Sequence, residues 1–171
     1  MKFTFFWHGP FSQWDTSPFM ALDGLMYNTA EQYMMGQKAL LFQDEETFKK
    51  IMATTSPKEQ KALGRIVKNF NPLVWDTMST LIVYDGNLLK FSQNEKHREA
   101  LMNTGDTILV EASPYDAIWG VGLAEDNPFI DDMSMWQGQN RLGFVLTKVR
   151  ETLRDEEAQD NNSEEAHQNE K

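Results

Sequence analysis

Helix starts that carry a proline at the first position are the strongest structural signal in this sequence. Residues 56–59 are Ser-Pro-Lys-Glu, in which the serine caps the first turn and the glutamate can bond back to the cap. Proline suits the first helical position because its φ is already helical and its missing N–H would have no partner there. Asn71-Pro72 repeats the signal before a stripe of Val74, Trp75, Met78, Leu81 and Ile82. This pattern favours a mostly helical fold.

Three further segments extend the helical pattern. Thr29 caps a predicted helix that runs to about residue 42, with a buried stripe that includes Ala30, Tyr33, Met34 and Leu41. Asn94 caps a shorter predicted helix through Leu101. The last predicted helix has an amphipathic stripe made of Leu142, Val145, Leu146, Val149 and Leu153.

Short β segments account for most of the remaining chain. Residues 2–7 form a β-like apolar run, and residues 107–111 alternate like a strand. Residues 19–26 contain Asp23-Gly24 between apolar residues, which is a hairpin signal. We therefore predict one compact α+β domain, predominantly helical, with a small β-sheet. The long irregular segment 113–140 is of a kind that usually carries function in compact domains.

Acidic residues are concentrated at the C-terminal end. Residues 155–171 contain seven acidic residues and one lysine, so they hold most of the net charge of −10. This segment has almost no apolar residues to bury, and we predict that it is a disordered acidic tail after a domain of residues 1–154. The domain lacks the basic patch that a general nucleic-acid-binding protein needs.

The composition also bears on the compartment. The chain has no cysteine, which excludes disulfides, thiolate zinc sites and cysteine nucleophiles and fits a reducing environment. The N-terminal apolar run is too short for a signal peptide, and no apolar stretch approaches the roughly 20 residues that span a bilayer. We expect a cytoplasmic protein that does not enter a membrane.

Glu31 and Lys38 are the first candidate site residues. In a helix they lie on one narrow stripe at the edge of the apolar face, about 10 Å apart along the axis. Partial desolvation at such an edge moves the pKa values of a carboxylate and an amine toward neutrality. The alternative is a solvated helix flank, which spacing alone favours.

The segment after the predicted strand at 107–111 is the second candidate. It contains the carboxylate of Asp116, the aromatic residues Tyr115 and Trp119, and Gly120 and Gly122, where a ligand can approach the backbone. Aromatic rings beside a carboxylate suit a flat, polar base. In the alternative interpretation, Trp119 simply fills the core.

A third candidate opens the last predicted helix, where Asn140 and Arg141 lie within a glycine-containing segment. Backbone N–H groups at a helix start beside an arginine suit a phosphate. In the alternative, Asn140 caps the helix and Arg141 is a surface residue. The three histidines are scattered and show no metal-binding spacing, so no metal site is predicted.

Five segments occur in a fixed order along the chain: Phe11-Ser12-Gln13-Trp14, Thr29-Ala30-Glu31-Gln32-Tyr33 with Gln37-Lys38, Leu63-Gly64-Arg65, Tyr115-Asp116 with Trp119-Gly120, and Gly138-Gln139-Asn140-Arg141-Leu142-Gly143. This ordered set resembles the NADAR (YbiA-like) N-glycosidase family. The resemblance covers roughly residues 4–153, which is nearly the whole predicted domain.

The resemblance implies a mostly helical YbiA-like fold that hydrolyses the N-glycosidic bond between a base and a phosphorylated ribose or ADP-ribose. Aminopyrimidine ribotides of riboflavin synthesis and ADP-ribosylated guanine, also within nucleic acid, are the substrates it suggests. By resemblance, the catalytic residues are Glu31, Lys38 and Asp116. The substrate-binding residues are Trp14, Arg65, Trp119, Gly120, Asn140 and Arg141. Neither a metal nor an organic cofactor is expected.

The candidate residues are compatible with two routes to hydrolysis. A carboxylate can stabilise positive charge at the sugar C1 while water attacks and the base is protonated. Alternatively, Lys38 can capture C1 of a ring-opened ribose as a Schiff base that water then hydrolyses. The rival interpretation is an ADP-ribose or nucleotide-binding module with little turnover, which would not require Glu31, Lys38 and Asp116 together.

Overall fold

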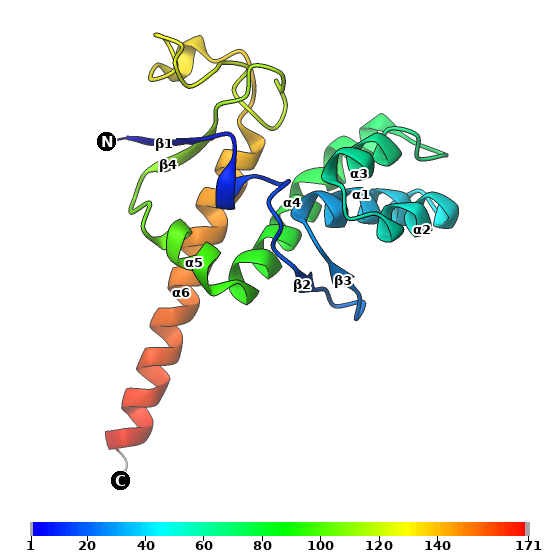
Figure 1. Ribbon diagram of the computed structural model, residues 1–171. Coiled ribbons are helices and arrows are strands. Elements are labelled where there is room, and N and C mark those ends of the chain that lie inside the picture. The colour runs from blue at the N-terminus through cyan, green and yellow to red at the C-terminus, as the bar shows by residue number, and fades with distance from the viewer. Residues whose placement is uncertain (1, 170–171) are drawn as a thin grey trace.

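Helix α4 divides the molecule into two sides. The computed structural model describes residues 2–169, of which residues 163–169 are described by their backbone alone. In Figure 1, α1, α2 and α3 gather on one side of α4, while α5 and the β1–β4 pair lie on the other. The elements in chain order are β1 (Phe3–Phe6), η1 (Gly9–Phe11), β2 (Phe19–Met20), β3 (Met26–Tyr27), α1 (Ala30–Leu41), α2 (Glu45–Ala53), α3 (Pro57–Gly64), α4 (Pro72–Gln93), α5 (Glu95–Met102), β4 (Ile108–Glu111), η2 (Met133–Met135) and α6 (Arg141–Asn169).

The predicted helix starts are present. Thr29 Oγ1 accepts a hydrogen bond from Gln32 N at 3.0 Å, and Ser56 Oγ accepts one from Glu59 N at 3.3 Å. The Glu59 carboxylate bonds to the hydroxyl of Thr54 instead of returning to the cap backbone, so only half of the expected capping box forms. Asn94 precedes α5 as predicted, but its side chain makes no capping bond to that helix.

Helix α2 (Glu45–Ala53) was not anticipated from the sequence pattern. Its first turn is capped by Asp44, whose Oδ1 accepts a hydrogen bond from Thr47 N at 3.1 Å. The other carboxylate oxygen of Asp44 accepts a bond from Lys68 N at 2.8 Å, which ties the helix start to the chain after α3. Asp44 therefore caps the start of α2 and also holds the chain that follows α3.

The β structure consists of two small sheets rather than one. β1 and β4 pair in parallel, with Phe3 opposite Ile108 and Phe6 opposite Glu111. β2 and β3 form the predicted hairpin around Asp23-Gly24, whose turn closes with a 2.9 Å bond from Leu25 N to Asp23 Oδ1. The parallel pair matters most for function, because it places the end of β4 beside the N-terminal segment.

The main hydrophobic core lies between α1, α4 and α6. The stripe predicted for the last helix is confirmed, since all five of its residues are buried: Leu142, Val145, Leu146, Val149 and Leu153. Helix α1 differs from the prediction, because α2, α3 and α4 all pack against it. Its buried surface therefore extends beyond the expected stripe to polar residues, including Glu31 and Gln32.

The irregular segment 113–140 builds a small core of its own. Val121, Leu123 and Ile130 pack with Phe3 and Val110, and Trp136 covers them. The Trp136 indole N–H donates to Ile130 O at 2.8 Å. Trp136 is therefore part of this local core, while the earlier part of the segment is free to face the candidate site.

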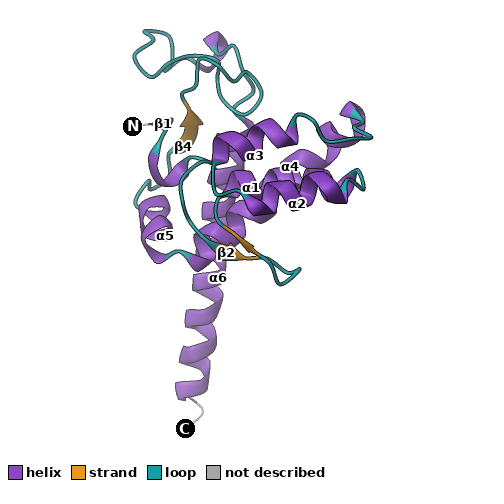
Figure 2. Ribbon diagram, turned by 45° about the vertical axis from the view of Figure 1, so that its right-hand side comes forward, coloured by secondary structure: helices purple, strands orange, loops and turns teal. Residues whose placement is uncertain are grey.

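Helix α6 continues well beyond the predicted domain boundary. It runs to Asn169, so residues 155–169 have helical backbone where the sequence predicts disorder, and this part projects away from the other elements in Figures 1 and 2. The segment contains neither glycine nor proline, and Glu157 pairs with Arg98 at 2.7 Å. The boundary at residue 154 stays a prediction. Within residues 2–169, no helix is both long and apolar enough to cross a membrane.

Candidate active site

A cavity of about 460 Å³ opens where α1, α3, the N-terminal segment and the chain after β4 meet. Its wall combines carboxylates, cations and aromatic rings. The lining residues are Trp7, His8, Ser12, Gln13, Trp14, Glu31, Met34, Met35, Lys38, Lys61, Gly64, Arg65, Trp75, Glu111, Ser113, Tyr115, Asp116 and Trp119. All three predicted catalytic residues and three predicted substrate-binding residues, Trp14, Arg65 and Trp119, lie in this wall.

Glu31 is buried at the start of α1 and faces the cavity. Its backbone N–H donates to Gln13 O at 3.0 Å, and the residue is only 6% exposed, so it does not lie on a solvated flank. Among the described residues, none donates a hydrogen bond to its carboxylate. Burial raises the pKa of Glu31 to about 7, the positive charges of Lys61, Arg65 and Lys38 oppose this shift, and the negative charge of Asp116 adds to it.

Lys38 lies two turns further along the same helix. Its Nζ donates to Gly64 O at 2.7 Å and lies 4.4 Å from the centre of the Phe70 ring and 5.3 Å from that of Trp75. Burial lowers the pKa of Lys38, and the charge of Glu31 opposes that shift. Its amine makes no ion pair with a carboxylate of residues 2–162, the part of the chain whose side chains are described. The hydrogen bond to Gly64 O therefore orients the amine, and no carboxylate of the described side chains pairs with its charge.

Asp116 shapes the loop that brings Trp119 to the cavity. Its Oδ1 accepts hydrogen bonds from Ile118 N at 2.9 Å and from Trp119 N at 2.7 Å. Trp119 is half-buried, packs on the main hydrophobic core and also lines the cavity. The two interpretations of Trp119 from the sequence, core residue and pocket wall, therefore describe two faces of one side chain.

Lys61 and Arg65 add positive charge from α3 and its C-terminal end. Lys61 Nζ lies 5.9 Å from the ring centre of Trp14, which is itself 43% exposed at the cavity mouth. Together with Lys38 they place three cations along one side of the cavity. This arrangement suits an anionic group such as a phosphate.

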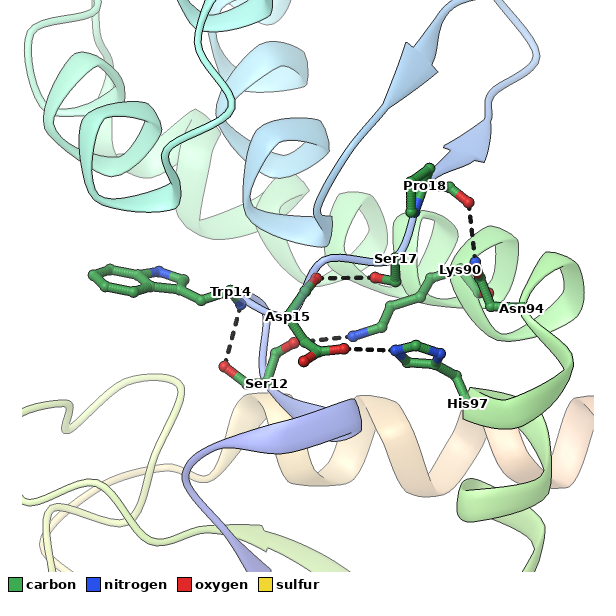
Figure 3. A network of polar contacts seen from close by, with 8 residues as sticks. All are labelled: Ser12, Trp14, Asp15, Ser17, Pro18, Lys90, Asn94 and His97. Carbon is green, nitrogen blue, oxygen red and sulfur yellow. Dashed lines mark hydrogen bonds and ion pairs between the residues drawn. The ribbon is translucent and has the colours of Figure 1, made fainter.

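Side chains of α4 and α5 hold the segment that carries Gln13 and Trp14 (Figure 3). The buried Lys90 of α4 donates from Nζ to Ser12 O at 2.9 Å, and His97 Nε2 lies 2.6 Å from Asp15 Oδ2. Burial lowers the pKa of Lys90 to about 7, and the negative charge of Asp15 opposes this shift. These contacts fix the backbone on which the cavity wall is built.

Gln13 is a cavity residue whose role the sequence analysis did not identify. Its Oε1 accepts a hydrogen bond from Asn87 Nδ2 at 2.8 Å, and the same nitrogen donates to Val83 O at 2.8 Å. Because Asn87 must present its nitrogen, the orientation of the Gln13 amide is fixed. Gln13 Nε2 is buried and has no hydrogen-bond partner among the described residues.

Other lining residues were also missed, and the reason differs for each. Trp75 belongs to the predicted stripe of α4, but that pattern does not distinguish a cavity wall from a core. Trp7 and His8 stack with ring centres 4.9 Å apart in a segment with no recognisable motif. Glu111 ends the strand predicted at 107–111, where alternation marks a face but not what that face contacts.

Three predicted substrate-binding residues lie outside the cavity wall. Asn140 is fully buried and bridges β4, since Oδ1 accepts from Glu111 N and Nδ2 donates to Leu109 O, both at 3.0 Å. Its φ of 52° is one that asparagine tolerates well. Gly143 allows α6 to approach, because a Cβ there would lie 2.1 Å from Leu109 O.

The other two residues of this group also contact protein rather than open space. Arg141 pairs with Asp76 at 2.7 Å and donates from Nε to Gln139 Oε1 at 2.8 Å. A Cβ on Gly120 would lie 2.9 Å from Asp116 O, so glycine is needed there for the backbone to pack on the Asp116 turn. Among the side chains of residues 2–162, no group of three or more histidine or acidic residues has a geometry that could hold a metal ion.

Known proteins are similar to this chain in sequence and in fold. The family model of the NADAR domain matches residues 3–154. N-glycosidase R617 of Acanthamoeba polyphaga mimivirus is 48% identical over 145 residues, which cover 82% of this chain and 85% of that protein. N-glycosidase YbiA of Escherichia coli (strain K12) is 30% identical over 146 residues, or 85% of this chain and 82% of that protein. The NMR structure of E. coli YbiA matches with a TM-score of 0.75 and 27% identity, over 92% of this chain and 88% of that chain.

The chain therefore belongs to the NADAR family. This confirms the resemblance seen in the sequence, and the structural match confirms a single, mostly helical α+β domain of the YbiA type. The relatives named N-glycosidases confirm the predicted enzyme class, hydrolases that act on N-glycosyl bonds.

We predict that Asn140 acts through stability. Asn140→Ala leaves the N–H of Glu111 and the C=O of Leu109 without partners, at about 1–3 kcal/mol each, so the free energy of unfolding should fall by roughly 2–6 kcal/mol in urea titrations. The control Arg141→Ala breaks an ion pair with an exposed aspartate and should change it by less than about 1 kcal/mol. An Asn140→Ala protein of full stability that no longer binds ligand would instead show direct contact with substrate.

Proposed function

We propose that this protein hydrolyses the N-glycosidic bond between a base and a phosphorylated ribose. The observation that carries the proposal is the carboxylate of Glu31, buried in the cavity wall with no hydrogen-bond donor from the described residues and with cations nearby. A purely structural buried carboxylate is normally paired or hydrogen-bonded. An unpaired one facing a cavity is suited to a positive charge that exists only during reaction, such as that at the sugar C1.

The rest of the wall is consistent with such a substrate. Lys61 and Arg65 approach from α3 and would hold the phosphate, which does not react but whose binding positions the sugar. Trp119 and Trp14 would stack on the flat base. In this proposal, Gly120, Asn140 and Arg141 act by supporting the loop that carries Asp116 and Trp119.

Lys38 gives the reaction a nucleophile. Its amine lines the cavity, is oriented by the Gly64 carbonyl, and has its pKa lowered by burial. A lysine with these properties can attack C1 of a ring-opened ribose and form a Schiff base that water hydrolyses. Glu31, close enough to affect the pKa of Lys38, would accept the proton of the attacking amine.

The physiological substrate belongs to one of two groups in this proposal. Aminopyrimidine ribotides of riboflavin synthesis need only the cavity itself. ADP-ribosylated guanine, free or within nucleic acid, would extend past the exposed rings of Trp7 and Tyr115 at the cavity mouth. Both substrate groups fit the cytoplasmic location that the sequence predicts.

We predict that Glu31→Gln abolishes most of the turnover and preserves the fold. Incubation with a phosphoribosyl aminopyrimidine should release free base from the wild type, and the variant should be slower by on the order of 10²–10⁴-fold, the usual range for acid–base groups. Glu45→Gln, on the exposed first turn of α2, is the matched control and should react at the wild-type rate. Tight binding of the ribotide by the wild type without release of base would instead support a binding module.

We predict that Lys38 forms a covalent intermediate. Borohydride added during turnover should trap a sugar adduct on Lys38, located by peptide mass spectrometry, and Lys38→Ala should lose both trapping and turnover. Lys61→Ala, which removes the other lysine of the cavity, should weaken binding but leave the adduct on Lys38. An active enzyme that yields no adduct on any lysine would assign the attack on C1 to water.

A further inference from the structure

The backbone of Glu111 is held by β1, by the side chain of Asn140 and by the chain that follows β4. It ends β4 opposite Phe6 of β1, and its N–H donates to Asn140 Oδ1 at 3.0 Å. Its carbonyl oxygen accepts from Ser113 N at 2.9 Å and from Val121 N at 3.0 Å. The Cα of Glu111 therefore has little freedom, and its side chain starts from a fixed point in the cavity wall.

The carboxylate of Glu111 faces the cavity without a partner. Its Oε2 is buried and accepts no hydrogen bond from the described residues. An unsatisfied buried carboxylate oxygen is rare in folded proteins and calls for an explanation. Because a charged carboxylate with a buried, unpartnered oxygen is costly, this environment favours the neutral form, in which the carboxyl group carries a proton.

The charges around the two glutamates differ in sign. Glu31 is influenced by three cations, Lys61, Arg65 and Lys38, and by one anion, Asp116. Glu111 is influenced by two anions, Asp116 from the following loop and Glu31 from α1, and by one cation, Lys61 from α3.

Cations favour the ionised form of a carboxyl group and anions favour the protonated form. Burial raises the pKa of both groups to about 7, while the neighbouring charges favour the protonated form of Glu111 and the ionised form of Glu31. The imidazole of His8 also lines this cavity.

We propose that Glu111 is a further catalytic residue, the acid that protonates the departing base while ionised Glu31 serves the attack at C1. The inference rests on the proposed hydrolysis of an N-glycoside. The geometry that carries it is a fixed, unpartnered carboxyl group in the same cavity as Glu31 and Lys38.

The proton balance closes without a co-reactant other than water. When the C1–N bond breaks, its electron pair goes to the base nitrogen, which takes the proton from Glu111. Glu31 accepts the proton of the group that attacks C1. When water attacks C1 directly, its hydroxyl stays on C1 and the proton on Glu31 returns to Glu111. When Lys38 attacks, water hydrolyses the Schiff base, and the proton that this water releases, together with the one on Glu31, restores the acid form of Glu111 and the free amine of Lys38. The net change is one water consumed for one base and one free sugar phosphate.

The pH dependence of turnover tests the assignment. Burial, with Asp116 and Glu31 adding to it, raises the pKa of Glu111 to about 7, so kcat/KM of the wild type should fall as pH rises through that value and the acid is lost. In Glu111→Gln this basic limb should disappear, and kcat at neutral pH should drop by on the order of 10²–10⁴-fold with KM and the melting temperature nearly unchanged. Glu111→Asp keeps a carboxyl group and should keep the limb at a reduced rate.

Each alternative gives a different result. Glu125→Gln, an exposed glutamate of the same irregular segment, is the matched control and should match the wild type. The role of Glu111 would be overturned if the Glu111→Gln variant turned over as fast as the wild type, or if its pH profile kept the basic limb. If Glu111→Gln fails to fold, a wild-type or Glu111→Asp profile without a basic limb near pH 7 would overturn it as well. Failure of the proposed function itself would appear as no base release by the wild type, before any variant is compared.

Discussion

The packing of helix α1 against three neighbours is the constraint on which the site depends. Because α2, α3 and α4 all contact α1, even its first turn is removed from water. Glu31 is therefore buried although it is charged and lies at the edge of the helix's apolar face. The same packing brings α3 close enough for Lys61 and Arg65 to influence Glu31, and it places Lys38 between Gly64 and the ring of Trp75 in α4.

This burial lowers stability at the pH where the site works. The folded state raises the pKa of Glu31 from 4.5 to about 7, so between these values the folded chain holds a proton that the unfolded chain releases. Stability is therefore unaffected by this group below pH 4.5 and decreases as pH rises toward 7, by on the order of 3 kcal/mol. A protein keeps such an unfavourable group where function requires it, as pKa shifts of this kind cluster at active sites.

Local signals predicted much of the fold, and the family resemblance named six candidate site residues that line the cavity. The caps Thr29, Ser56 and Asn71 are read directly from residue types and spacing, and the structure contains them. The sequence does not predict a role for Glu111 or Gln13. Each has a buried side-chain atom without a hydrogen-bond partner among the described residues, and only the tertiary structure reveals this. The resemblance implies that Asn140 binds substrate, which stays a prediction. The structure shows its side-chain amide bonded to Leu109 and Glu111 of β4, 31 and 29 residues away in sequence.

The proposed chemistry requires that Glu31 and Glu111, which line one cavity, both titrate near neutral pH. The most direct measurement is the carboxyl ¹³C NMR titration of Glu31 and Glu111 in the folded protein, with each resonance assigned by its Gln variant. We expect midpoints near pH 7 for both groups, and a shift in the midpoint of Glu111 when Glu31 is replaced, because the negative charge of Glu31 raises the pKa of Glu111. Two independent titrations near pH 4.5, the ordinary value for glutamate, would contradict it.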